Sequence, residues 1–256
     1  MSTTWRVHPS ASIAKSAVLE TGCVVGAFVV VEEGVRVGAN TTLATGTILH
    51  SGTIVGANCR LGPYAVVGGE PMDTAWRGEA SFAVLEDNVT LREFTTVHRA
   101  SGEGAETRVG RGTLAMSYVH ISHNAHVGRD CVLTTQVQLG GHTRVGDYAV
   151  LGSSAILHQH CRVGPYAMFG AGSAANRDIF PFSMARGNPA RHYRLNRVGL
   201  LRRGVSAERY GYLERALRAL RRRDAAQLEE LARLSDDVAL LLSFKMSSRR
   251  GLSAFI

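Results

Sequence analysis

An aliphatic residue recurs at every sixth position over most of the chain. From Val7 the series is Ile13, Leu19, Val25, Val31, Val37, Leu43, Leu49, Val55, Leu61 and Val67. Four residues after each member stands a small or β-branched residue, and glycine often follows the aliphatic directly. The same phase resumes at Leu85, and again from Val109 to Phe169.

This period predicts the fold class. An α-helix would repeat its apolar positions every 3.6 residues and an amphipathic strand every two. Hexapeptide repeats are typical of parallel β-helices, in which three hexads form one triangular coil with the aliphatic residues pointing inward. Coils stack at the interstrand spacing of about 4.8 Å, and each needs its neighbours for stability. We therefore expect a left-handed parallel β-helix over residues 1–190.

Two polar segments interrupt the repeat, at about residues 68–84 and 99–108. Both contain glycine and leave the hexad phase. They are either tolerated insertions or functional loops, because loops on a rigid scaffold frequently carry binding and catalytic residues.

The hexads stop after Gly187-Asn188-Pro189, and helical patterns follow. Gly204 is expected to end a helix. Ser206, Asp224 and Ser235 each precede an apolar helical pattern and are expected to be N-caps. We therefore predict a small α-helical domain over residues 191–256.

The net charge of +8 is unevenly distributed. Acidic and basic residues balance over 1–190, so the whole excess lies in 191–256. A basic segment suits an acidic partner, such as a nucleotide, an acidic carrier protein, nucleic acid or a membrane surface, but it is also compatible with solvated helix faces. Few aromatic residues interleave with the arginines, so nucleic acid is not expected.

Three further features bear on location and redox state. No run of apolar residues is long enough to span a membrane. The start, Met1 to Arg6, lacks the basic and apolar regions of a signal peptide, so we expect a cytoplasmic protein. The cysteines are separated by multiples of six and form no CxxC pair, which predicts core positions and neither disulfides nor metal ligands. They are Cys23, Cys59, Cys131 and Cys161.

Histidines gather between positions 120 and 160. Residues 18 apart lie above one another on adjacent coils, which places a polar patch over three coils. Its members are His123, Asn124, Gly141, His142, Gln159 and His160. Three imidazoles could hold zinc, as in the β-helical carbonic anhydrases that this patch resembles. Those enzymes pair two histidines five residues apart, and no two histidines here have that spacing, so we expect no metal.

Acyl transfer is the second chemistry that fits this patch. A neutral imidazole can take a proton from an attacking hydroxyl or amine near neutral pH. A backbone N–H can receive the oxyanion that develops when a thioester is attacked. His123 is the expected base and Gly141, one coil above it, the expected oxyanion donor.

The chain resembles the acyl-[acyl-carrier-protein]–UDP-N-acetylglucosamine O-acyltransferases, the first committed enzymes of lipid A synthesis. The resemblance runs from Val7-His8-Pro9 to Ser248-Arg249-Arg250-Gly251-Leu252 and rests on a series of motifs in order. They are Gly68-Gly69-Glu70-Pro71 with Asp73 and Gly78-Glu79, Arg92-Glu93, Val97-His98-Arg99, Val119-His120-Ile121-Ser122-His123-Asn124, Leu139-Gly140-Gly141-His142, Ile156-Leu157-His158-Gln159, Gly187-Asn188-Pro189-Ala190, Asn196, Gly199-Leu200 and Arg202-Arg203-Gly204.

The resemblance implies roles for individual residues. His123 matches the general base for the sugar 3-position, His120 a residue near the substrate, and Gly141 the oxyanion donor. Asp73, His142 and Gln159 match sugar or acyl contacts, and Asn124 is expected among the substrate-binding residues. Asn196, Arg202 and Arg203 match the nucleotide end, where paired guanidinium groups suit a diphosphate. Ala171 falls where side-chain bulk sets acyl-chain length.

The resemblance also implies the assembly and partners. The family is trimeric, with active sites between neighbouring β-helices, and the basic helical domain suits an acidic acyl carrier protein. No cofactor is expected. The substrates would be a UDP-sugar and a fatty acyl group, which is expected to be 3-hydroxylated.

The chain departs from the family pattern at several places. Met72, Ala75 and Trp76 replace a glutamine, a lysine and a tyrosine around Asp73, Asn124 replaces an acidic residue, and Val198 replaces a glutamate. These changes leave the acyl chain and the acceptor open, including a 3-amino or another nucleotide sugar.

Other readings of the scaffold remain. An N-acyltransferase of the next lipid A step would carry an N-terminal uridine-binding domain, for which the hexads starting at Val7 leave no room. Acetyl-CoA-dependent sugar acetyltransferases usually lack the helical tail. A non-catalytic hexapeptide-repeat trimer would need no proton-active residue between coils.

Overall fold

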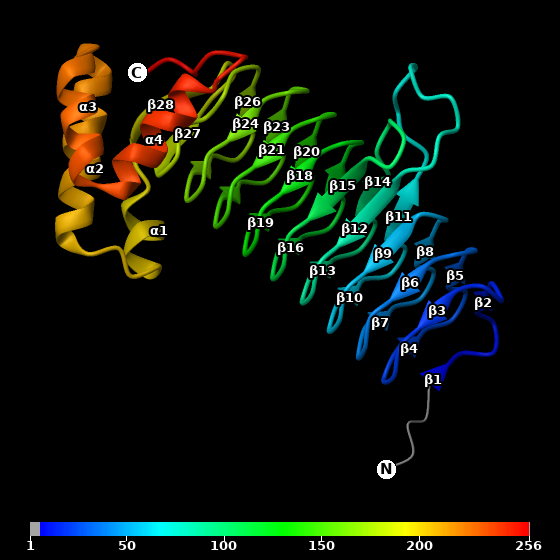
Figure 1. Cartoon of the computed structure of the whole chain (residues 1–256). Helices are drawn as coiled ribbons and strands as arrows, with labels where there is room; N and C mark the ends of the chain where they lie inside the picture. The colour runs from blue at the N-terminus through cyan, green and yellow to red at the C-terminus, as the bar shows by residue number, and fades with distance from the viewer. Residues whose placement is uncertain (1–5, 256) are drawn as a thin grey trace.

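The computed structural model describes residues 6–255. The expectation that the chain does not begin with a signal peptide rests on Met1 to Arg6, of which the first five residues lie outside the described residues. The chain forms a long triangular β-helix with helices gathered at its C-terminal end and β1 (Arg6–Val7) at the other end (Figure 1). The left-handed parallel β-helix predicted from the hexads is confirmed.

Each coil contributes one short strand to each of three parallel sheets, which we call A, B and C.
Sheet A contains β1 (Arg6–Val7), β4 (Val24–Val25), β7 (Thr42–Leu43), β10 (Arg60–Leu61), β13 (Thr90–Leu91), β16 (Leu114–Ala115), β19 (Val132–Leu133), β22 (Val150–Leu151), β25 (Met168–Phe169), β27 (Ser183–Arg186) and β28 (Arg191–Leu195). Sheet B contains β2 (Ser12–Ile13), β5 (Val30–Val31), β8 (Ile48–Leu49), β11 (Val66–Gly69), β14 (Thr96–His98), β17 (His120–Ile121), β20 (Gln138–Leu139), β23 (Ile156–Leu157) and β26 (Ala174–Ala175). Sheet C contains β3 (Val18–Leu19), β6 (Arg36–Val37), β9 (Thr53–Val55), β12 (Phe82–Leu85), β15 (Glu106–Val109), β18 (His126–Val127), β21 (Arg144–Val145) and β24 (Arg162–Val163).

The hexad aliphatics build the core because they occupy the inward position of each strand. Leu43, Leu61 and Leu91 are fully buried and follow one another along sheet A. The four cysteines are buried in the same core and form no disulfide, which confirms their expected packing role. Burial raises the pKa of the Cys131 thiol to about 12, so this group stays protonated.

The two interruptions both leave the β-helix at the corner between sheets B and C, the B–C corner. They span residues 70–81 and 99–105, which is shorter than expected because β11, β12 and β15 extend into the polar segments and pair across coils. The loops are tied together, since Gly102 N–H donates to Glu79 Oε1 (2.8 Å) and the Arg99 guanidinium lies 5.1 Å from the Trp76 ring centroid.

The C-terminal segment begins with a strand that the hexad analysis did not predict. β28 pairs antiparallel with β27 and extends sheet A. Helices α1 (Arg197–Arg202), α2 (Ala207–Arg222), α3 (Ala225–Leu234) and α4 (Asp236–Met246) follow. Ser206 and Asp224 cap α2 and α3 through their side chains as expected, whereas Ser235 stands at the N-cap of α4 without a side-chain cap bond.

A second hydrophobic core joins the helices to the last coils. Phe182, Leu200, Leu213 and Leu241 are fully buried within it. None of the helices in the described part of the chain is both long and apolar enough to cross a membrane.

Candidate active site

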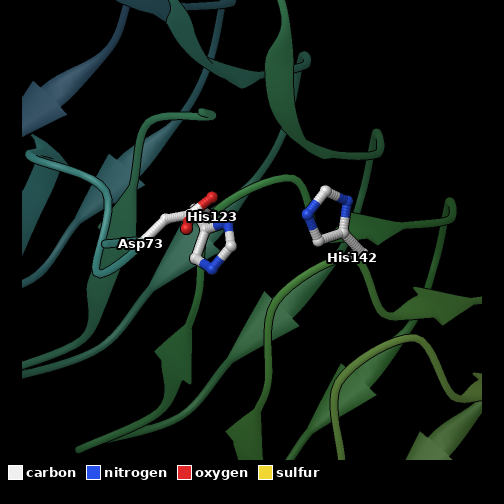
Figure 2. Close-up of side chains that lie close together, drawn as sticks. All are labelled: Asp73, His123 and His142. Atoms are coloured by element: carbon white, nitrogen blue, oxygen red, sulfur yellow. The ribbon is translucent and has the colours of Figure 1, made fainter. Parts of the chain in front are cut away.

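Three polar side chains meet at the B–C corner. Asp73 comes from the loop 70–81, while His123 and His142 follow β17 and β20 on successive coils (Figure 2). One potential ligand atom from each lies within 4.8 Å of the other two. His123 is 7% exposed, so its ring is shielded while the other two side chains remain accessible.

A hydrogen-bond chain sets the tautomer of His123. Ser101 N–H donates to Oδ1 of Asn124 (3.0 Å), and Nδ2 of Asn124 donates to the Ser101 carbonyl (3.0 Å). These bonds identify the oxygen of the Asn124 amide. That oxygen lies 2.9 Å from Nδ1 of His123, which must therefore carry the donated proton. Nε2 of His123 keeps its lone pair and can act as a base.

Gly141 provides the space beside that lone pair. A Cβ at this position would lie 2.5 Å from Nε2 of His123, so any other residue would displace the ring from its present position. Among the described residues, the Gly141 N–H makes no backbone hydrogen bond. The expected base and the expected oxyanion donor are therefore adjacent, as the 18-residue spacing predicted.

Asp73 stays ionised near the histidines. The Ala75 N–H donates to its Oδ1 at 2.9 Å. This hydrogen bond is the largest cause that lowers the pKa of the Asp73 carboxyl. The Ser101 side chain and then the His123 and His142 rings lower it further. The loop thus presents a carboxylate to the two rings.

His142 and His120 both favour the neutral imidazole. The His142 ring meets His123 edge-on at 5.2 Å and stacks on His160 at 4.7 Å between centroids. Burial, His160 and His123 lower the pKa of His142. Burial, with His98 and His123 nearby, lowers the pKa of His120 to about 4, and its Nδ1 lies 2.8 Å from the Thr96 hydroxyl.

Gln159 stands one coil beyond Gly141 at the same corner and is exposed. Ala171 is also exposed but lies between β25 and β26, at the corner of sheets A and B. The expected acyl-length residue is therefore at a different corner of the same chain from His123.

The expected nucleotide-binding residues occupy the third corner, between sheets C and A. Asn196 is buried, and its side chain donates to the Tyr166 carbonyl (2.9 Å) and accepts from Gly199 N–H as the N-cap of α1. The Arg203 guanidinium lies 4.6 Å from the Tyr148 ring centroid, and Arg202 is exposed beside it. Within one chain, these expected nucleotide-binding residues therefore lie at a different corner from His123.

Sequence reasoning missed Ser101 and Glu79, which hold the loop against Asn124 and thereby orient His123. Both residues lie in loops outside the hexad repeat, where position along the chain does not indicate which residues are close in space. The signal that could have pointed to them is their place in or beside the family motifs Gly78-Glu79 and Val97-His98-Arg99.

Comparison with known proteins agrees with this architecture. Residues 178–253 match the family model described as UDP-N-acetylglucosamine O-acyltransferase, domain 2, and residues 34–69 match the bacterial transferase hexapeptide model. An acyl-[acyl-carrier-protein]–UDP-N-acetylglucosamine O-acyltransferase of a Sulfurihydrogenibium species is 44% identical, over 96% of this chain and 94% of the relative. That of Saccharophagus degradans is 39% identical, over 96% and 98%.

Solved structures agree as well. The UDP-N-acetylglucosamine acyltransferase of Campylobacter jejuni superposes with a TM-score of 0.92 at 32% identity, covering 98% of this chain and all of that one. The Francisella novicida enzyme gives 0.93 at 29%, covering 97% and 94%. Two relatives are 39% and 44% identical to this chain over nearly their full length. The chain therefore belongs to the acyl-[acyl-carrier-protein]–UDP-N-acetylglucosamine O-acyltransferases.

Proposed function

We propose that the protein transfers a fatty acyl group from acyl carrier protein to the 3-hydroxyl of UDP-N-acetylglucosamine, the first step of lipid A synthesis. The observation that carries the proposal is the fixed tautomer of His123, which aims a basic nitrogen into the space left by Gly141. The names of the relatives favour a hydroxyl acceptor over an amine and an enzyme over a non-catalytic trimer.

The proposed reaction uses the site as follows. Nε2 of His123 takes the proton of the 3-hydroxyl while that oxygen attacks the thioester carbonyl. The Gly141 N–H stabilises the oxyanion of the tetrahedral intermediate. The intermediate collapses by breaking the C–S bond, and the imidazolium returns its proton to the departing thiolate of the carrier protein.

The three corners support a homotrimer. His123 and Ala171 lie on two corners of one β-helix, and Arg202 lies on helix α1 beside the third corner. Parallel copies around a threefold axis would bring different corners of adjacent chains together. We therefore assign base and nucleotide-binding residues of one active site to two neighbouring subunits.

Surface charge supports an acidic acyl carrier protein as the partner. Exposed arginines of α2, including Arg215, Arg218 and Arg222, offer a basic face to such a protein.

The cysteines support the compartment. Four thiols that form no disulfide suit a reducing compartment, so we place the protein in the cytoplasm.

The product identifies the activity. Purified protein is incubated with UDP-N-acetylglucosamine and a mixture of acyl-carrier-protein thioesters, and the nucleotide sugar is analysed by mass spectrometry. The proposal predicts one added acyl group that mild alkali removes, as expected for an ester. An alkali-resistant product, or transfer only to a 3-amino sugar, would contradict the hydroxyl acceptor.

A further inference from the structure

We propose that Asp73, His123 and His142 also form an inhibitory site for a divalent transition metal, with Zn²⁺ as the best fit. The proposed acyl transfer needs no metal, so this inference goes beyond it. The site would lie where the acceptor sugar is deprotonated, and metal binding would switch the enzyme off.

The donor set and its spacing suit zinc. The three ligand atoms lie within 4.8 Å of one another. Zinc binds imidazole nitrogen and carboxylate oxygen at about 2.0–2.2 Å in tetrahedral geometry, which requires ligand atoms about 3.4 Å apart. Asp73 sits on a loop and His142 is accessible, so modest side-chain rotation closes the remaining gap. Two imidazoles with one carboxylate favour Zn²⁺ or Co²⁺ over Mg²⁺ or Ca²⁺.

The surroundings of His123 match those of a metal ligand. A metal-bound imidazole donates its second N–H to a carbonyl or carboxylate, which fixes the ring. Nδ1 of His123 makes that bond to Oδ1 of Asn124, and Asn124 is itself held by Ser101. The lone pair that a metal would occupy is therefore the one that accepts the substrate proton, which is why binding would inhibit.

The charge at the site is unbalanced. Within residues 6–255, no basic side chain forms a salt bridge with Asp73, although several other carboxylates have one. The nearby Arg77 guanidinium turns back onto the carbonyls of Thr74 (2.7 Å) and Trp76 (3.0 Å). A carboxylate facing two imidazoles without a basic partner leaves a place for a cation.

Metal binding can be measured without substrate. Chelator-treated and desalted protein is titrated with Zn²⁺ against a chromophoric competitor, and with Co²⁺ by its visible spectrum. We expect one metal per chain, and at least about tenfold weaker binding in Asp73→Asn and His142→Ala. His50→Ala is the matched control, because His50 pairs with Glu32 on coils nearer the N-terminal end of the β-helix. Circular dichroism checks that each variant is folded.

Two results would overturn the inference: unchanged affinity in both Asp73→Asn and His142→Ala, or loss of the metal in His50→Ala. Acyl transfer in excess chelator tests the proposed function separately. If the protein transfers the acyl group but its metal binding does not depend on Asp73, only the metal inference is refuted. If metal binding depends on the site but no UDP-sugar is acylated, only the proposed function is refuted. If Zn²⁺ inhibits transfer and a chelator restores it, both are supported.

Discussion

Ser101 and Asn124 exchange two hydrogen bonds, each 3.0 Å long, between the loop 99–105 and the corner that carries His123. The backbone of Ser101 offers one donor and one acceptor, and the Asn124 amide matches both. This exchange leaves a single amide orientation and therefore a single proton position on His123. Asn124, a neutral residue, thus orients the proposed base His123 through a loop that belongs to another coil.

Asn124→Ala removes the acceptor for Nδ1 of His123. We expect kcat to fall by about 10²-fold, a share of the 10²–10⁴ that a positioned general base contributes, with little change in KM. Asn88→Ala is the matched control, since both asparagines adopt left-handed backbone (φ 57° and 59°) and Asn88 lies at another corner. Nitrogen NMR of His123 should report a mixed tautomer in Asn124→Ala alone. A single unchanged tautomer would refute the positioning role.

Gly141→Ala should displace the base. The new Cβ would lie 2.5 Å from Nε2 and 2.7 Å from Cε1 of His123, so the ring must move. A displacement near 1 Å costs about 10²-fold in rate. Gly211→Ala in α2 meets no atom within 4 Å and should instead stabilise the helix by about 0.5–1 kcal/mol without loss of activity. Full activity in Gly141→Ala, measured by the product assay, would contradict the tight contact.

Mixed trimers test whether two subunits share each site. His123→Ala and Arg202→Ala are each expected to be impaired, the second mainly by a raised KM for the nucleotide sugar because a diphosphate contact is lost. If one neighbour supplies His123 and the other Arg202, random co-assembly restores about a quarter of the sites. Arg36→Ala, at an exposed arginine of β6 near the N-terminal end of the β-helix, is the control and should not affect activity. No recovery in co-expressed mixtures would place both residues in one chain's site.

His192 makes stability depend on pH. It is fully buried, and burial lowers its pKa to about 3. The Ser183 hydroxyl donates to the Phe180 carbonyl (2.8 Å), so Nδ1 of His192 donates to that hydroxyl (3.0 Å) as a neutral ring. The unfolded chain takes up the proton near pH 6.5, so stability is complete above that pH and declines as pH falls towards 3.

The expected contribution is about 2 kcal/mol lost between pH 7 and pH 5. His192→Phe keeps a ring between Phe180 and Phe255 but cannot titrate. Unfolding measured at both pH values should therefore show a smaller loss in the variant than in the native protein. Equal losses would contradict the role of His192.

The sequence predicted those parts of the molecule that obey a period. The hexads indicate the coils, and the 18-residue spacing alone predicts that Gly141 lies against His123. The loops follow no period, so the bonds of Ser101 and the contact between Arg99 and Trp76 could not be anticipated. β28 was missed because a single antiparallel strand at the end of a sheet has no repeat to mark it.

Replacing the proposed base tests the mechanism: native protein and His123→Ala are compared in the acyl-transfer product assay, after equal folding and assembly are confirmed. We expect acylated UDP-N-acetylglucosamine from the native protein and a rate at least about 10²-fold lower from the variant. A variant that retains the native rate would show that His123 is not the base.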